Sequence, residues 1–422
     1  MTSFYHPESE TLPQSVIKKI QLDLLKRQFM RALKTPFYAN LWKNKPLPKI
    51  KTLDDIVRLP LLDKEDLRRA YPDGLIATDK KDIVRIHTSS GTTGIPTVLY
   101  LTQNDLNGAT DTMARGLWMA GLRPTDTFQN MMSYGLFTGG LMMHYGAEKL
   151  GVTVLPASTG NTLRQLQYMR DFHVNAIHLT PGYLQYLMNS LKPNERFSSS
   201  LKTAIIGAEA ISLQTKEHIE NRLGIKLFNC YGLSEMNGPG VAMECSYHNG
   251  MHVWEDRYLM EIIDPQTLQP VPEGEYGELV LTDLTREAMP LLRYRTHDIT
   301  RILTEPCACG RTHRRIECIQ GRTDDMLIIN GVNIFPSQIE AAIFTVIPTP
   351  LNWVIQIDEK NGLKKLSLTV EVQNELLNNT NLLNQLSNLL QAFITIKPSI
   401  SFVPPKTLPE ITSKAKRIII NK

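Results

Sequence analysis

The hydrophobic residues between positions 82 and 230 follow two alternating spacings. Short, mostly apolar runs, such as residues 152–155 and 176–179, alternate with longer stretches in which apolar residues recur at helical spacing, such as residues 183–191. The short runs are typical of buried strands, and the longer stretches are typical of amphipathic helices. Their alternation predicts βαβ units, in which a largely parallel sheet is covered by helices.

One helix in this region has a clear start signal. Thr102 and Asp105 have the spacing of a capping box, and Leu106, Met113 and Leu117 then mark the buried stripe of the helix. Further helices are expected near residues 139–150, 163–169 and 212–224. The remaining strands of the region are expected at residues 82–86, 97–101, 127–132, 203–206 and 225–229.

The pattern differs on either side of this region. Residues 1 to about 75 indicate an accessory helical segment, whose first helix has one apolar face: Ile17, Ile20, Leu24, Leu25 and Phe29. Asp63 is a plausible N-cap for a second, short helix. Between residues 255 and 305, short runs at 258–263, 277–282 and 299–303 predict antiparallel strands.

The composition changes again past Arg322. A strand at residues 326–329, a helix near 337–344, a hairpin turning at 359–362 and a helix near 382–393 predict a small α+β domain. We therefore predict an α/β protein with two domains. Residues 1–322 form a large domain with helix-flanked, largely parallel sheets and a smaller antiparallel β region, and residues 323–422 form a small, mobile α+β domain.

Composition is that of an ordinary globular protein of 422 residues, with 42% hydrophobic and 21% charged residues. Its formal net charge is +4, and because basic and acidic residues are interspersed, no nucleic-acid surface is expected. No apolar run approaches the roughly 18 residues of a membrane span, and the first residues lack the apolar core of a signal peptide. We therefore expect a cytoplasmic protein with no membrane partner.

The richest candidate for ligand binding is the segment 87–96, His-Thr-Ser-Ser-Gly-Thr-Thr-Gly-Ile-Pro. Its glycines and short hydroxyl side chains leave backbone N–H groups unhindered, which suits a polyphosphate. Expected strands lie on both sides, whereas a Walker-type loop enters a helix and contains a Gly-Lys-Ser/Thr signature. The segment has no lysine. If it binds ATP, a compensating cation must come from elsewhere in the chain.

Four further stretches are each weak signals when taken alone. They are residues 231–235 (Tyr-Gly-Leu-Ser-Glu), 293–298 (Arg-Tyr-Arg-Thr-His-Asp), 321–325 (Gly-Arg-Thr-Asp-Asp) and 412–417 (Thr-Ser-Lys-Ala-Lys-Arg). Tyr231 and Glu235 follow an expected strand, where an aromatic ring could stack on a base and a carboxylate could hold Mg²⁺; a surface turn explains them about as well. Asp298 at a loop end could accept both ribose hydroxyls, although a salt-bridged loop is the simpler reading.

Together with the loop, these stretches resemble the acyl-adenylate-forming superfamily of acyl-CoA synthetases, luciferases and peptide-synthetase adenylation domains. The closer resemblance is to the phenylacetate–CoA ligase family. It rests on residues 134–140, 207–209, 254–256, 293–296 and, as its most distinctive block, 324–340. The likeness covers nearly the whole chain and is weakest over the first 60 residues.

The resemblance implies specific roles for individual residues. The phosphate-binding loop would comprise Ser89, Ser90, Gly91, Thr92, Thr93 and Gly94. Other residues at the nucleotide would be Gly207, Ala208, Glu209, Asn229, Tyr231, Gly232, Asp298 and Arg322. Of these, Tyr231 would flank adenine, Asp298 would bind ribose and Arg322 would reach the ribose-phosphate region, while Glu235 would ligate Mg²⁺.

The missing cation would be Lys414, the adenylation lysine in this resemblance. The family usually has Gly before that lysine, whereas this chain has Ser413; the spacing to Arg417 favours Lys414 over Lys416. A substrate carboxylate would attack the α-phosphorus of ATP and expel pyrophosphate, and Lys414 and Mg²⁺ would stabilise the negative charge.

A second half-reaction would transfer the acyl group to coenzyme A. Rotation at Asp324 would withdraw Lys414 and present the region of Gly331, Val332 and Asn333 to the thiol.

An aryl group in the substrate is suggested by Tyr134 and Phe137, with Gly139 and Gly140 leaving space; Gly207 would also line this pocket. Core packing is the alternative for Phe137. The family resemblance favours an arylacetic acid such as phenylacetate, and indoleacetate or a benzoate fits the same argument.

Five cysteines, odd in number and clustered late in the chain, favour a metal or free thiols over disulfides. Cys245, His252, Cys307 and Cys309 make a Cys₃His set suited to structural zinc, although the spacing is loose and His248 or His313 could replace His252. Some relatives with the Cys-x-Cys-Gly-Arg stretch look zinc-bearing.

Two other functions remain open from the sequence. The first is adenylation with transfer to a carrier protein or an amine, and the second is a nucleotide-binding or scaffold protein on a decayed ligase fold. Presence of Glu235, Asp298, Arg322 and Lys414 together argues against decay, because folding alone requires none of them. The family habit suggests a homodimer.

Overall fold

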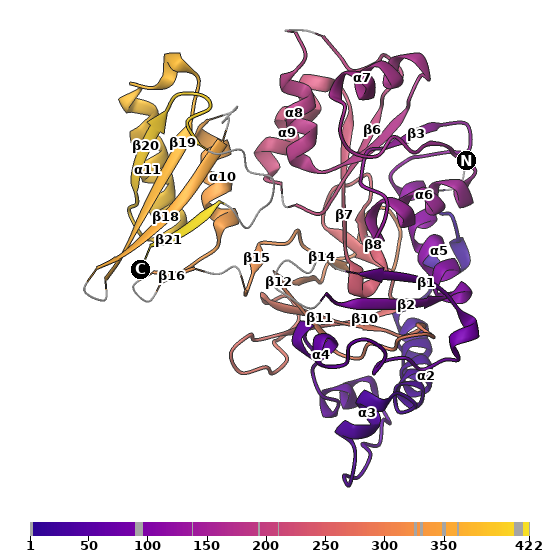
Figure 1. Ribbon diagram of the computed structural model, residues 1–422. Helices are drawn as coiled ribbons and strands as arrows, with labels where there is room; N and C mark the ends of the chain where they lie inside the picture. Colours follow the sequence, from indigo (N-terminus) through magenta and orange to yellow (C-terminus); the bar gives the residue numbers. More distant parts are fainter. Residues whose placement is uncertain are drawn as a thin grey trace. The chain divides into compact units, whose positions relative to one another are not determined.

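The structure, a computed structural model, describes residues 3–88, 96–136, 138–192, 195–209, 211–324, 327–329, 332–347, 352–360, 363–408 and 417–421. The chain divides into two compact units. The first comprises Met1–Glu209 and Arg222–Cys318, and the second comprises Ala210–Asn221 and Ile319–Lys422 (Figure 1).

A nine-stranded mixed sheet is the centre of the first unit, with the order β13-β14-β9-β8-β7-β6-β5-β3-β4. The strands from β4 to β7 are parallel, and the neighbours from β7 to β13 are antiparallel. The nine strands are β3 (Thr127–Asn130), β4 (Thr153–Leu155), β5 (Ala176–Leu179), β6 (Thr203–Ile206), β7 (Lys226–Leu233), β8 (Gly238–Glu244), β9 (Met251–Val253), β13 (Ile302–Leu303) and β14 (Arg315–Ile316). The parallel half confirms the βαβ prediction.

Helices alternate with the parallel strands, as the hydrophobic spacing predicted. They are α5 (Gln103–Met119), α6 (Thr138–Leu150), α7 (Thr162–Asp171) and α8 (Pro181–Asn189). Between β6 and β7 in the chain follows α9 (Leu213–Leu223), most of whose residues belong to the second unit. The capping box at the start of α5 is present, because the Thr102 hydroxyl accepts from the Asp105 N–H. α5 packs against α6 so closely that a Cβ at Gly146 would lie 2.3 Å from Cβ of Met113.

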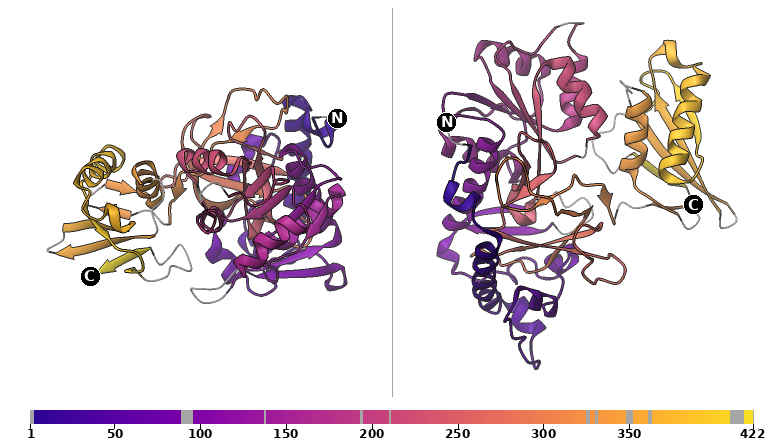
Figure 2. Two further views of the ribbon diagram at one scale, coloured as in Figure 1. Left: turned by 90° about the horizontal axis from the view of Figure 1, so that it is seen from above. Right: turned by 180° about the vertical axis from the view of Figure 1, so that it is seen from behind.

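Helices make up most of the N-terminal segment: α1 (Pro7–Glu10), α2 (Gln14–Ala32), α3 (Pro36–Leu41), η1 (Leu53–Arg58), α4 (Lys64–Arg69) and η2 (Lys80–Asp82). Asp63 caps α4, as predicted. α2 is the long indigo helix in Figure 2. Its buried face differs from the apolar stripe that the sequence predicted. It includes Gln21 and Gln28, while Ile20 and Leu24 are only half-buried. The glutamines are buried because their amides donate to main-chain carbonyls of the large unit.

Two smaller antiparallel groups of strands complete the first unit. They are the hairpin β1 (Ile83–Thr88) with β2 (Val98–Thr102), and the group β10 (Tyr258–Ile263), β11 (Gly277–Asp283) and β12 (Tyr294–Thr300). The prediction of a strand at 299–303 was displaced, because the chain pairs with β11 from Tyr294 onward. Asp298 therefore lies within a strand and not at a loop end.

The second unit is a small α+β fold. Its elements from residue 319 onward are β15 (Gly321–Arg322), β16 (Leu327–Ile329), β17 (Val332–Ile334), α10 (Pro336–Val346), β18 (Asn352–Lys360), β19 (Leu363–Glu371), η4 (Asn374–Leu376), α11 (Thr380–Ile394), β20 (Ser399–Val403) and β21 (Ile418–Asn421). Four of the strands form a sheet in the order β20-β19-β18-β21.

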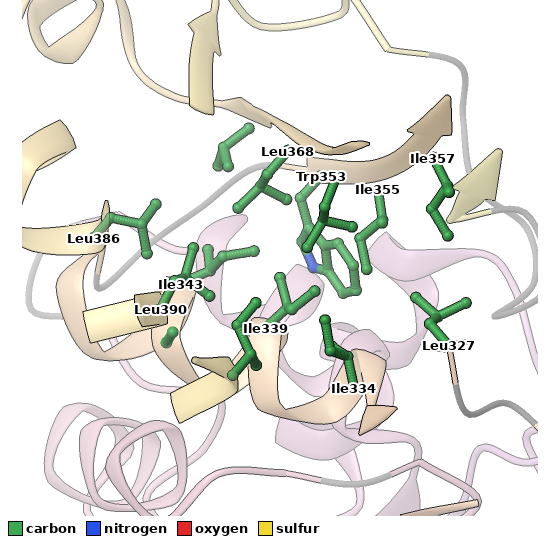
Figure 3. Packing of buried hydrophobic residues seen from close by; sticks show 14 of the residues in the cluster. Leu327, Ile334, Ile339, Ile343, Trp353, Ile355, Ile357, Leu368, Leu386 and Leu390 are labelled. Carbon is green, nitrogen blue, oxygen red and sulfur yellow. The ribbon is translucent and has the colours of Figure 1, made fainter. Parts of the chain in front are cut away.

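Alternate residues of the central strands of this sheet form the core of the second unit. Trp353, Ile355 and Ile357 of β18 pack with Ile343 of α10 and Leu390 of α11 (Figure 3). The period of two along β18 places these side chains on the face that α10 and α11 cover. Among the described residues of both units, no helix is long and apolar enough to cross a membrane.

Candidate functional site

β7 joins the parallel and antiparallel halves of the large sheet, and the candidate site is built around its end. Residues 226–229 pair in parallel with β6, whereas Cys230 and Tyr231 pair antiparallel with β8. The segment 231–233 is therefore strand, although the sequence predicted that the strand ends at residue 229. Gly232 is required by the close approach of β8, because a Cβ at this position would lie 1.9 Å from the Gly238 carbonyl oxygen.

Tyr231 and Asp298 are brought together by this arrangement. The Tyr231 hydroxyl donates to the Asp298 carboxylate at 2.6 Å, and both side chains are buried. The pair connects β7 with β12, two strands of different sheets. The ring and the carboxylate predicted to contact adenine and ribose thus lie next to each other.

Glu235 lies in the short helical turn η3 (Ser234–Met236), directly after β7. Its side chain is buried, and the Thr97 hydroxyl donates to one carboxylate oxygen at a long 3.5 Å. Thr97 immediately precedes β2, the strand that leaves the candidate phosphate loop. A buried carboxylate near this loop is suited to hold a divalent cation.

Gly207, Ala208 and Glu209 follow β6, as the sequence indicated. Gly207 packs on Cys230, since a Cβ would lie 2.6 Å from its Sγ, so a larger residue would require Cys230 to shift. Ala208 has a φ of +67°, an uncommon conformation for a residue with a side chain. Glu209 accepts from the Gly182 N–H at the start of α8.

Asn229 is fixed by Glu244 of β8. Its Nδ2 donates to Oε1 of Glu244 at 3.0 Å, and its main-chain N–H donates to Oε2 at 2.8 Å.

Several predicted site residues lie outside the described residues: Ser89, Ser90, Gly91, Thr92, Thr93, Gly94, Phe137, Gly331 and Lys414. The strands on either side of the candidate phosphate loop are described. β1 and β2 are antiparallel, and Thr88 pairs with Val98. The segment 89–95 is therefore flanked by two antiparallel strands, whereas a Walker-type loop is followed by a helix.

Tyr134, the candidate acid-pocket residue, takes part in a chain of hydrogen bonds. Asn130 Nδ2 lies 2.9 Å from the Tyr134 hydroxyl, and that hydroxyl lies 3.2 Å from Nδ1 of His144. Burial raises the pKa of Tyr134 to about 12, so the hydroxyl stays protonated. A Cβ at Gly140 would lie 2.4 Å from the Ser133 carbonyl oxygen, so this glycine allows the main chain of Ser133 to approach closely.

The predicted hinge and coenzyme A residues belong to the second unit. Arg322 and Asp324 form a bidentate ion pair, with two N–O distances of 2.8 Å. Val332 packs against the core of this unit, and Asn333 pairs with Ile328 across β16 and β17.

A second cluster of polar side chains consists of Cys245, His252, Cys307 and Cys309, termed the Cys/His cluster below. The ligand atoms of these four residues all lie within 4.8 Å of one another. Cys245 follows β8, His252 lies on β9, and the other two cysteines lie between β13 and β14. Because β8, β9, β14 and β13 are consecutive neighbours in the sheet, residues distant in sequence meet here.

Hydrogen bonds orient the cluster. His252 Nδ1 donates to the His313 carbonyl oxygen at 2.8 Å, which leaves the Nε2 lone pair directed at Cys309 Sγ, 3.3 Å away. Such a second hydrogen bond is typical of metal-binding histidines. The two alternative histidines have other partners, since His248 contacts Glu244 and His313 accepts from the Glu255 N–H.

Comparisons with known proteins identify the family. The family model for the AMP-binding enzyme matches residues 22–283, and that for the AMP-binding enzyme C-terminal domain matches residues 331–422. Phenylacetate-coenzyme A ligase of Thermus thermophilus is 45% identical over 87% of this chain and 84% of its own length. The protein belongs to the phenylacetate–CoA ligase family of AMP-binding enzymes. Its reaction class is therefore that of an AMP-forming acid–thiol ligase.

Other relatives extend over the same region. Phenylacetate-coenzyme A ligase of Escherichia coli is 41% identical over 87% of this chain and 86% of its own length. The enzyme of the same name from Aromatoleum evansii is 38% identical over 97% of this chain and 96% of its own. A crystal structure of 2-hydroxyisobutyryl-CoA ligase with an adenylate, 26% identical, matches with a TM-score of 0.90 over 100% of this chain and 93% of the other. The α/β fold predicted from the sequence is thus that of a ligase in this superfamily.

Sequence reasoning missed one residue of the site, Arg286. It is fully buried, and its guanidinium donates to the Glu235 carbonyl oxygen. Arg286 stands in the stretch Thr-Arg-Glu-Ala after β11, where a single sequence offers no signal beyond an ordinary charged turn.

Proposed function

We propose that this chain activates an aryl carboxylic acid, phenylacetate or a close analogue, with ATP and transfers the acyl group to coenzyme A. The observation that carries the proposal is the buried arrangement of Tyr231, Asp298 and Glu235 at the end of β7, next to the strands of the phosphate loop. The names of the 38–45% identical relatives support the choice of acid and thiol.

The nucleotide roles follow from the chemistry of these side chains. The Tyr231 ring offers a flat face to adenine, and its hydroxyl keeps the Asp298 carboxylate in place for the ribose hydroxyls. Glu235 would hold Mg²⁺, which when bound neutralises charge on the phosphate oxygens. Ser89 to Gly94 would cradle the phosphates through their N–H groups.

Lys414 supplies the second cation in this proposal. It would stabilise the charge that builds up as the substrate carboxylate attacks the α-phosphorus and pyrophosphate leaves. The bond from that phosphorus to the bridging oxygen breaks, and the acyl-adenylate forms. The thiol of coenzyme A then attacks the acyl carbon and AMP leaves, with Asp324 as the hinge and residues 331–333 near the thiol.

Tyr134 would contact the aryl ring of the acid. Its orientation is fixed by Asn130 and His144 through the hydroxyl, so the ring presents a defined face. Phe137 and Gly207 would complete the pocket.

A panel of acids tests the proposal. Purified protein is incubated with ATP, Mg²⁺ and phenylacetate, indoleacetate, benzoate or acetate, and pyrophosphate release is measured with and without coenzyme A. We expect phenylacetate to give the highest rate and to yield its thioester. Pyrophosphate release without any thioester would instead indicate a carrier protein or amine as acceptor, and no release with any acid would contradict the proposal.

We also propose that the Cys/His cluster binds a structural Zn²⁺. Three sulfurs and one imidazole nitrogen within 4.8 Å of one another match a Cys₃His tetrahedron in composition and size. Cys245 and Cys307 are buried and Cys309 is half-buried. The pKa of Cys245 is raised by its hydrogen bond with Cys309 and by burial. Metal analysis should find about one zinc per chain; a content near zero in protein purified without chelators would contradict it.

The homodimer and the cytoplasmic location expected from the sequence stay predictions. Analytical ultracentrifugation tests the first, and fractionation of the source cells tests the second.

A further inference from the structure

The turn that presents Glu235 is held at each of its residues. Ser234 Oγ lies 3.3 Å from the Thr138 hydroxyl, and the Met236 carbonyl oxygen accepts from the Tyr258 hydroxyl at 3.0 Å. Asn237, which follows the turn with a φ of +67°, donates from Nδ2 to the Asp283 carboxylate at 3.1 Å. The carbonyl of Glu235 itself accepts from Arg286.

Arg286 is the unusual member of this set. Its side chain is 0% exposed, and burial lowers the pKa of its guanidinium. Among the described residues, Nε and Nη2 have no hydrogen-bond partner and no carboxylate forms an ion pair with it. The neighbouring buried arginine, Arg257, by contrast forms an ion pair with Asp283 at 3.2 Å.

The main chain of Arg286 is held from the opposite side. Its carbonyl oxygen accepts from Nε2 of Gln28 at 2.7 Å and from Nη1 of Arg31 at 3.3 Å, both on α2. A continuous path therefore runs from α2 through Arg286 to the backbone of Glu235. The N-terminal helix, which the sequence presents as accessory, is connected to the residue proposed to hold the metal.

A buried guanidinium with unmade hydrogen bonds is costly to the fold, and an apolar residue of similar volume would avoid that cost. The fold therefore gains little from the charge at this position. The hydrogen bond from the guanidinium to the Glu235 carbonyl does, however, constrain the Glu235 backbone, and through it the position of the carboxylate. A rigid carboxylate binds a small, strongly hydrated cation better than a mobile one, because less freedom is lost on binding.

We propose that Arg286 is a positioning residue for Mg²⁺–ATP: it fixes the Glu235 turn, and the buried glutamine Gln28 of α2 holds Arg286 in place. The inference rests on the proposed role of Glu235. It assigns to the N-terminal helix a part in the nucleotide site, in addition to its packing.

Binding of ATP in the presence and absence of Mg²⁺ separates positioning from a merely structural role. Isothermal titration calorimetry with ATP and no acid, in Mg²⁺ or in EDTA, is compared for the wild type, Arg286→Gln and Arg286→Lys. The Mg²⁺ concentration for half-maximal pyrophosphate release is measured as a second readout. Circular dichroism confirms that each variant is folded.

We expect Arg286→Gln to weaken ATP binding in Mg²⁺ by about tenfold, the usual effect of losing a hydrogen bond from a charged donor. Binding in EDTA should change by less than about twofold, because surrounding contacts stay in place. Arg286→Lys should recover part of the loss, since it can still donate to the Glu235 carbonyl. Equal weakening with and without Mg²⁺, or no weakening at all, would overturn the proposal.

Two matched variants of α2 provide a second test if the Arg286 variants do not fold. Gln28→Leu removes the contact with Arg286, while Gln21→Leu removes equivalent contacts with the carbonyls of Glu255 and Tyr258 on the same helix. We expect only Gln28→Leu to raise the Mg²⁺ requirement, by about threefold for one neutral hydrogen bond. Identical behaviour of the two variants would contradict the path through Gln28 and Arg286.

Failure of this inference is distinct from failure of the proposed function. A wild type that neither binds ATP nor releases pyrophosphate would contradict the function. An active wild type whose Arg286 and Gln28 variants keep the normal Mg²⁺ requirement would contradict only the positioning role.

Discussion

Two clusters of polar side chains lie on the antiparallel side of β7, and they are built by opposite means. In the first, termed the carboxylate edge (Tyr231, Glu235 and Asp298), hydrogen bonds from several segments orient each side chain or the turn that presents it. In the Cys/His cluster, the ligand atoms mostly face one another: the Cys245 and Cys307 sulfurs lie 3.6 Å apart, and the Cys309 sulfur lies 3.3 Å from His252 Nε2. The side chains of the carboxylate edge are each held by surrounding residues, whereas the four ligand atoms of the Cys/His cluster converge on one point.

This difference indicates that the two clusters have different functions. Charged groups that must contact a reacting ligand need a rigid frame that is complete before the ligand binds. Ligands of a structural metal obtain much of their order from the ion, so folding and metal binding are coupled. Substitutions at the carboxylate edge should therefore reduce the reaction rate and leave the stability unchanged. Substitutions in the Cys/His cluster should reduce the stability and leave the rate per folded molecule unchanged.

The largest effect is expected for Lys414→Ala, which tests the chemistry assigned to the carboxylate edge. Loss of a charge-stabilising group at the transition state should lower pyrophosphate release by about 10²–10³. Conversion of a supplied acyl-adenylate to thioester should continue, and zinc content should not change. Equal loss of both half-reactions would contradict the role of Lys414.

Cys309→Ser tests the other region. Removing a ligand should release the metal and lower the free energy of unfolding by roughly 3 kcal/mol, as measured by urea denaturation. The turnover of the remaining folded enzyme at low temperature should be near that of the wild type. Cys230→Ser, a change at a buried thiol outside the cluster, is the control and should keep the metal. A large fall in turnover without loss of stability would reverse the comparison.

Low pH should destabilise the protein through a third site, His178 of β5, independently of the metal. Complete burial lowers its pKa to about 3, so the unfolded chain, with a pKa near 6.5, binds a proton that the folded chain excludes. Stability is thus unaffected above pH 6.5 and falls as pH decreases, by about 2 kcal/mol between pH 7 and 5. Urea titrations should show this slope in Cys309→Ser as well, and His178→Asn should lack it.

The smallest effect is expected for Tyr231→Phe, which keeps the ring and removes the donor to Asp298. With one hydrogen bond to a buried carboxylate lost, KM for ATP should rise about tenfold while kcat changes less. Steady-state kinetics at saturating acid measure this effect. A change confined to kcat would indicate that the pair acts in the chemical step instead of in nucleotide binding.

The periodic elements could be predicted from the sequence with small shifts in boundaries. Residues 176–179 and 203–206 are strands as expected, because a short, mostly apolar run between helices has few other ways to be buried. β7 was predicted too short, since its extension through Leu233 depends on pairing with β8, which local patterns do not encode. The start of β12 at Tyr294 was missed for the same reason.

Some features of the site could likewise be predicted from the sequence and others could not. Glu235 and Asp298 were named from motifs, yet neither the bond from Tyr231 to Asp298 nor the support from Arg286 was foreseen. The apolar stripe predicted for α2 does not match its buried face, which includes glutamines. Glutamines can replace leucines on a buried face when main-chain carbonyls lie opposite.

The sequence by itself determined the order of strands and helices, the loop at residues 89–94 that lacks a lysine, and the residue types available for nucleotide and metal. These depend on local periodicity and side-chain chemistry, which the chain carries wherever it folds. Only the tertiary structure decided which histidine meets the three cysteines and which arginine holds the Glu235 turn. Those choices depend on strand neighbours and on contacts between residues some 50 or more positions apart, and no local pattern records them.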